Sequence, residues 1–164
     1  MNGPRIVWLP DGRRLHMNHG PIDLIVEAFG AADEVEAAYR QAARRFQTIL
    51  GELVGELTEL RRPSSLRPRS FAGPTARRME AAASCFAEIF VTPMAAVAGS
   101  VADEMLAATC AGRTLDRAYV NDGGDIAIHL APGQSMKAAI AGTGHGFSDR
   151  LVIRAEDRVR GIAT

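Results

Sequence analysis

Apolar residues near the start of the chain fall into short runs separated by turn residues. The runs at 6–9 and 13–17 flank Asp11 and Gly12, and an Asp-Gly pair between such runs is typical of a β-hairpin. A third run at 22–28 follows Gly20 and Pro21. We therefore predict an N-terminal β-meander of three strands.

From residue 33 onward, apolar residues recur every three or four positions, where before they recurred about every two. This pattern predicts one long amphipathic helix over 33–61, begun by a capping box of Asp33 and Glu36 and ended before Pro63. One face of that helix collects the apolar side chains of Val35, Tyr39, Ala42, Phe46, Ile49, Leu53, Leu57 and Leu60.

Two further helices are predicted in the middle of the chain. The first covers 75–87, with an inner face that includes Met79 and Phe86, and a short strand follows at 88–91. The second covers 92–110, where Thr92 is a suitable N-cap and Pro93 a suitable first residue. Its first turns, 94–99, are apolar on all sides, so we expect them to be buried.

The last third of the chain is predicted to be strands joined by glycine turns. The expected strands are 117–120, 125–130, 136–140 and 151–154. The predicted fold class is therefore α+β, with an N-terminal β-meander, three helices and a glycine-punctuated antiparallel or mixed sheet. At 164 residues, 1–164 fit one domain.

Charge and composition exclude several classes of function. Nineteen basic and nineteen acidic residues give a net charge of zero, which argues against nucleic acid as a partner. No apolar run approaches the ~20 residues of a membrane helix, and the N-terminus lacks a signal-peptide pattern, so we expect a cytoplasmic protein with no membrane partner. Lys137 is the only lysine, and six arginines cluster between 61 and 78. A GC-rich coding sequence explains this preference for arginine over lysine. Binding of phosphate or carboxylate groups, which arginine contacts with two hydrogen bonds, is the functional alternative.

A candidate ligand site combines two segments. The turn 121–125 reads NDGGD, and a Gly-Gly pair lets a ligand approach the backbone closely. The helix start at Thr92 offers free N–H groups, which suit a phosphate. NDGGD is also an ordinary hairpin composition, so a purely structural turn remains open. The GTGHG segment at 142–146 lacks the lysine of a phosphate loop, and no histidines have the spacing of a zinc site.

These two segments carry a resemblance to a known family. Residues 118–126, AYVNDGGDI, resemble the Asn-x-Gly-Gly-Asp motif of the ApbE superfamily of FAD-dependent flavin transferases. Residues 92–103 resemble the helix that precedes that motif there. FVTPMAAVAG at 90–99, GPID at 20–23 and GIAT at 161–164 are similar to a branch of ApbE-like proteins, so the chain is identified as a member of that superfamily.

The resemblance implies a flavin nucleotide, FAD or FMN, bound with Mg²⁺, and an acceptor protein whose threonine or serine receives FMN. It implies the backbone carbonyl of Ala95 as a metal ligand. The cofactor-binding residues it implies are Thr92, Pro93, Met94, Ala95, Asn121, Gly123, Gly124, Asp125 and Thr164. Two positions depart from the transferases: Ala98 stands where they commonly carry lysine, and Thr92 where they carry aspartate. The alternatives are a non-enzymatic module that has lost flavin transfer, or a binder of another phosphorylated ligand.

Family members continue beyond the point at which this chain ends, so we expect it to lack a C-terminal segment. Thr164 is then expected at the edge of the pocket, near the 121–125 turn. An uncovered strand edge at this point predicts a homo-oligomer, or pairing with the missing segment.

Overall fold

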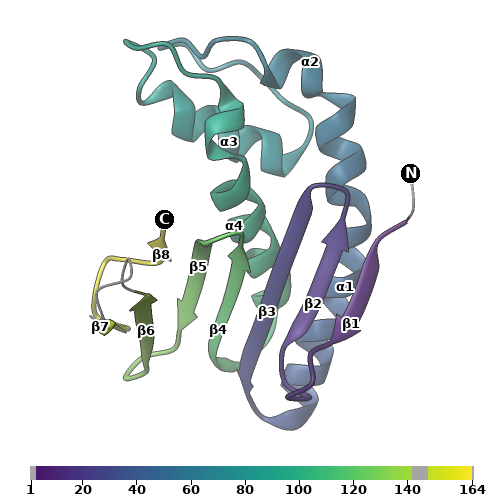
Figure 1. Cartoon of the computed structure of the whole chain (residues 1–164), viewed down its shortest axis with the longest axis vertical. Helices are drawn as coiled ribbons and strands as arrows, with labels where there is room; N and C mark the ends of the chain where they lie inside the picture. Colours follow the sequence, from purple (N-terminus) through teal and green to yellow (C-terminus); the bar gives the residue numbers. More distant parts are fainter. Residues whose placement is uncertain (1–2, 142–147, 164) are drawn as a thin grey trace.

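The computed structural model describes residues 3–141 and 148–163. Their main feature is a six-stranded antiparallel sheet with the helices gathered on one face (Figure 1), so the expected α+β class is confirmed. The strand order is β1-β2-β3-β4-β5-β8, and β6 and β7 form a separate two-stranded sheet. No helix in the described ranges has the length and apolar character needed to cross a membrane.

The predicted N-terminal meander is present. Its strands are β1 (Arg5–Trp8), β2 (Leu15–His19) and β3 (Ile22–Gly30), each antiparallel to the next. The Asp11 carboxylate closes the first turn by accepting the backbone N–H groups of Arg13 and Arg14. The second turn uses Gly20 at φ +60°, a conformation that side chains other than glycine rarely adopt.

The predicted long helix is the longest helix, but it is broken near its end. It consists of α1 (Ala32–Gly55) and the single turn α2 (Leu57–Leu60). At the break, the Glu56 carboxylate accepts the N–H groups of Ala72 and Gly73, which ties this point to the start of the next helix. The capping-box prediction was wrong, because Ala31 precedes the helix and no side chain caps it.

The second helix is shorter than predicted. α3 runs over Pro74–Ser84. Turns and bends at residues 85–90 replace the expected strand, and the N–H of Ile89 bonds to the carbonyl of Phe86 within them. Met79 is buried as expected. Phe86 is not on an inner face; it lies beyond the helix end and is 63% exposed.

The third helix begins differently from the prediction. Pro93–Ala96 form a 3₁₀ turn, η1, and the α-helix α4 covers Val97–Cys110. The Thr92 side chain makes no capping hydrogen bond; its backbone carbonyl accepts the N–H of Ala95 instead. The apolar start is only partly buried, and Ala95 is exposed, because the neighbouring elements cover one side of it.

The four predicted C-terminal strands are present, most of them longer than predicted, and a fifth short strand, β8, was not predicted. They are β4 (Leu115–Asp122), β5 (Asp125–Leu130), β6 (Ser135–Ala141), β7 (Ser148–Arg154) and the short β8 (Gly161–Ile162). The 142–146 segment lies outside the described residues.

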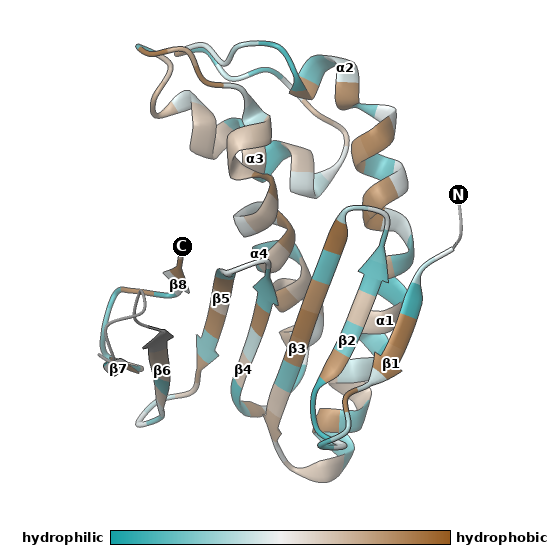
Figure 2. Ribbon diagram, in the orientation of Figure 1, coloured by the Kyte–Doolittle hydropathy of each residue, from teal (hydrophilic) through white to brown (hydrophobic). Residues whose placement is uncertain are grey.

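The two faces of the sheet differ in composition. Even-numbered residues of β3 from 22 to 28 and of β4 from 118 to 122, such as Leu24, Val26 and Val120, are buried on the helix-covered face. Figure 2 shows hydrophobic colour along β3 and on the helices behind the sheet. The odd-numbered residues between them, such as Glu27 and Tyr119, point to the helix-free face. Over one end of that face, β6 and β7 add a small second cluster around Ile128, Leu130 and Ile153.

Candidate ligand-binding cavity

The structure brings the two predicted ligand segments together. The first turn of α4 lies beside the 121–125 turn: a Cβ added at Gly99 would lie 3.6 Å from Oδ2 of Asp125. The turn itself is closed by Oδ1 of Asn121, which accepts the N–H of Gly124 at 2.9 Å. The oxygen of Asn121 therefore has a structural role in the hairpin.

The other predicted site residues differ in how deeply they are buried. Pro93 is buried, Met94 packs against the main core, and Gly123 is exposed at the tip of the turn with φ +61°. Thr164 lies outside the described residues. The roles assigned to these residues and to the Ala95 carbonyl remain predictions.

Carboxylates gather near the same turn. Asp122 is buried, and burial, together with the charges of Asp125 and Asp23, raises its pKa to about 6. The described ranges, 3–141 and 148–163, contain no group of three or more His, Cys, Asp or Glu side chains placed to hold a metal ion. Glu104 on α4 forms ion pairs with Arg45 and Arg78.

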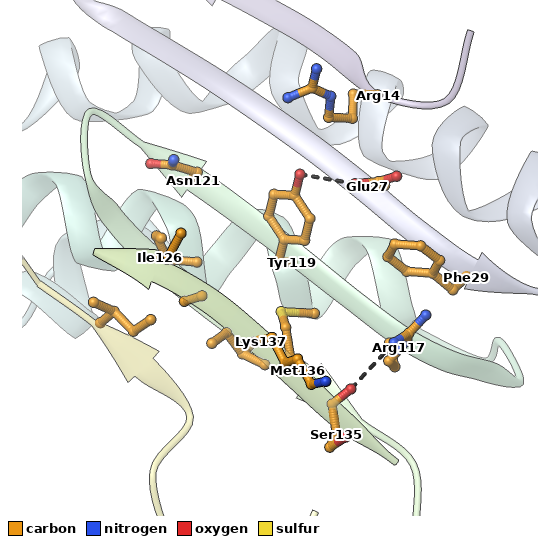
Figure 3. Close-up of a pocket in the computed structure, with 14 residues that line it drawn as sticks. Arg14, Glu27, Phe29, Arg117, Tyr119, Asn121, Ile126, Ser135, Met136 and Lys137 are labelled. Atoms are coloured by element: carbon orange, nitrogen blue, oxygen red, sulfur yellow. Dashed lines mark hydrogen bonds between the residues drawn. The ribbon is translucent and has the colours of Figure 1, made fainter. Parts of the chain in front are cut away.

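A cavity of about 800 Å³ lies on the helix-free face of the sheet, between β3, β4 and β5 on one side and β6 on the other (Figure 3). Asn121 lines it, so it adjoins the predicted site. The remaining lining residues are Arg14, Glu27, Phe29, Arg117, Tyr119, Ile126, Ile128, Ser135, Met136, Lys137, Ala138, Ala139 and Ile162. Aromatic, aliphatic and cationic groups therefore share one space.

A hydrogen-bonded pair forms part of the cavity floor. The Tyr119 hydroxyl donates to Oε2 of Glu27 at 2.9 Å, and Nε of Arg13 lies 3.7 Å from Oε1 of the same carboxylate. Burial and the bond to Glu27 raise the pKa of Tyr119 to about 12. The phenol therefore stays protonated at neutral pH and holds the carboxylate in place.

Arg117 is a partly buried cation at the cavity wall that neighbouring groups hold in place. Its guanidinium lies 4.4 Å from the centre of the Phe29 ring, and one nitrogen donates to the carbonyl of Ser135 at 3.3 Å. Its Nε is buried without a hydrogen-bond partner among the described residues, and within them the side chain forms no ion pair. Arg14, by contrast, is paired with Asp11.

This arrangement suits a flat apolar ligand that carries an anionic group. Phe29, Tyr119 and Met136 offer faces on which a ring can pack, and Arg117 with Lys137 offers positive charge. Sequence reasoning missed the cavity, although a signal existed. Glu27, Arg117 and Tyr119 alternate with buried apolar residues in their strands, which marks a second, polar face.

Comparison with known proteins places the chain in a family. Residues 6–164 match the model of the family AbpE bacteria, so the chain belongs to that family. The match is to this specific family, and nothing in it indicates the ApbE flavin transferases, so the identification as a member of that superfamily was wrong. None of the curated proteins matches the chain.

Proposed function

We propose that this member of the AbpE bacteria family binds a flavin nucleotide, FMN or FAD, in the cavity between its sheet and β6. The observation that carries the proposal is Arg117, a partly buried cation at the cavity wall with no carboxylate partner among the described residues. A buried cation is stable when an opposite charge accompanies it, and a ligand phosphate supplies that charge.

The size and lining of the cavity support this ligand class. A volume of about 800 Å³ lies within the range of ~300–1,000 Å³ typical of small-molecule sites. The isoalloxazine ring is flat and mostly apolar, which fits packing against Phe29, Tyr119 and Met136. Asn121 and the Tyr119–Glu27 pair supply polar groups that can orient the polar edge of the ring.

The proposal concerns binding of the flavin nucleotide, and an acceptor protein and a bound Mg²⁺ are additions to it. In this proposal, the backbone carbonyl of Ala95 binds Mg²⁺ on the ligand phosphates. The 121–125 turn links the start of α4 to the cavity, because Asn121 lines the cavity while Asp125 lies beside Gly99.

A titration of the purified chain with riboflavin, FMN, FAD and ATP, followed by flavin fluorescence and calorimetry, tests the proposal. We expect saturable binding of FMN or FAD. Replacing Arg117 with Gln is expected to weaken FMN binding about tenfold, since a charged hydrogen bond contributes ~1.5–3 kcal/mol, and to leave riboflavin binding nearly unchanged. Arg158→Gln, a change of an exposed arginine outside the cavity, is the matched control.

The alternatives give distinct results in the same titration. If ATP binds and FMN does not displace it, the cavity binds a phosphorylated ligand other than a flavin nucleotide. Absence of saturable binding by all four compounds, with a folded protein by circular dichroism, would reject the proposal. Repeating the titration with and without Mg²⁺ tests the metal separately.

A further inference from the structure

Four large apolar side chains are exposed at the end of the molecule farthest from the β1–β2 turn. Leu66 is 73% exposed, Phe86 63%, Ile89 68% and Phe90 84%. Leu66 belongs to the connection between α2 and α3, and the other three to the connection between α3 and η1. We call these four residues the apical patch.

The two connections that carry the patch lie side by side. The N–H of Ser64 donates to the carbonyl of Val91 at 2.8 Å, which joins the two loops. Figure 1 shows both connections running together at the top of the view, and Figure 2 shows hydrophobic stretches within them. Single exposed apolar residues are common on proteins, but four large ones gathered on two neighbouring connections indicate an interaction surface.

The apolar area of the patch is a large share of what one partner contributes to a stable dimer. The two phenylalanines have side chains that can each bury ~150–250 Å², and Leu66 and Ile89 add further exposed apolar surface. A specific interface takes ~800 Å² from each partner, of which the centre is mostly apolar. The patch can therefore form the apolar centre of such an interface, with polar neighbours at its rim.

The patch carries charges of both signs at its edge, so two copies of it can be complementary in charge. Glu88 and Arg67 are both exposed beside the apolar residues, and neither forms an ion pair within the described part of the chain. In a two-fold symmetric contact, Glu88 of one copy can meet Arg67 of the other. The chain has a formal net charge of zero, so no overall repulsion opposes association of two copies.

We infer that the apical patch is the interface of a homodimer, in which a second copy of this chain covers Leu66, Phe86, Ile89 and Phe90. The inference rests on this surface alone and is independent of the ligand proposed for the cavity. It places self-association at the α3 end of the molecule, away from the C-terminal edge at which the sequence predicted a partner.

Sedimentation velocity over a range of protein concentrations tests the inference. We expect a monomer–dimer equilibrium whose dissociation constant rises at least tenfold in the double variant Ile89→Ser, Phe90→Ser, because each exposed side chain loses its burial against the partner. Val54→Ser changes another exposed apolar residue, 46% exposed on α1, and is expected to leave the constant unchanged.

A charge exchange separates a specific dimer from non-specific adhesion. Glu88→Arg alone is expected to weaken the dimer, and Glu88→Arg combined with Arg67→Glu to restore it. Cys85 is exposed next to Phe86, whereas burial raises the pKa of Cys110 to about 11. A short bis-maleimide should therefore join two copies through Cys85, and Cys85→Ser should abolish that product.

Three results would overturn the inference. The first is a monomer at all concentrations up to several hundred micromolar. The second is a dimer that the double variant does not weaken. The third is a monomer that binds phospholipid vesicles through the same four residues, which would make the patch a lipid contact.

Discussion

Asp122 places a carboxyl group among buried residues at the end of β4, where its charged form is disfavoured. Burial and the neighbouring Asp125 and Asp23 raise its pKa from 3.8 to about 6. Between these two values the folded protein holds a proton that the unfolded chain has released. The contribution of this group to stability is therefore present below about pH 4 and is lost as the pH rises through 6.

Replacing Asp122 with Asn should remove this pH dependence. We expect the free energy of unfolding at pH 7.5 to rise by about 3 kcal/mol, and to change little at pH 4, because each pKa unit of the shift from 3.8 to about 6 corresponds to ~1.4 kcal/mol. Urea unfolding between pH 4 and 8 measures the difference. Asp116→Asn, at an exposed position of the same strand, is the control. An equal effect of Asp122→Asn at both pH values would contradict the assignment.

At the same scale, sequence reasoning found one residue of the cavity directly and missed most of the others. Asn121 was predicted because it belongs to a recognisable turn. Phe29 and Arg117 are 88 positions apart in the sequence and become neighbours only through the β3–β4 register, which pairs them. Contacts of this kind depend on which strands pair, and local patterns do not contain that information.

Among the elements, the strands were predicted better than the helix ends. The 125–130 strand was predicted with the bounds of β5, because alternation of apolar residues and flanking glycines is a local signal. The break at Glu56 was missed because its cause is distant: the carboxylate bonds to Ala72 and Gly73. The expected strand at 88–91 contains the β-branched and aromatic residues Ile89, Phe90 and Val91, but it pairs with none of the strands in the described part of the chain.

The turn of the β4–β5 hairpin requires glycine at position 123, and the same substitution, glycine to alanine, in helix α1 serves as a comparison. Gly123 has φ +61° with open space around it, so Gly123→Ala is opposed by the backbone alone. We expect a loss of about 1 kcal/mol in unfolding free energy. Gly51 also has open space but lies within α1, where Gly51→Ala should stabilise by roughly 0.5–1 kcal/mol. Thermal and urea unfolding of both variants should show opposite signs; a stabilising Gly123→Ala would contradict the turn geometry.

At the scale of the whole molecule, stability is unevenly distributed. β3 and β4 pair with a strand on both edges and are covered by α1 and α4. Among the described residues, β6 and β7 pair as strands only with each other, and they pack on the small cluster of Ile128, Leu130 and Ile153. We expect amide hydrogens of β6 and β7 to exchange at least tenfold faster than those of β3 and β4, since local opening requires less buried surface to be exposed. Hydrogen exchange with mass spectrometry measures this. Uniform protection across both sheets would show that the hairpin opens only with the whole fold.

The difference between the two faces of the sheet also governs how freely the sequence can change. On β3 and β4, the even positions 22–28 and 118–122 are buried on the helix-covered face, while odd positions such as Glu27, Arg117 and Tyr119 line the cavity. A substitution at an odd position can therefore alter what the cavity accepts while the core that holds the fold stays intact. Tolerance to mutation should alternate with a period of two along each strand, so that ligand preference can diverge among related chains without loss of the scaffold.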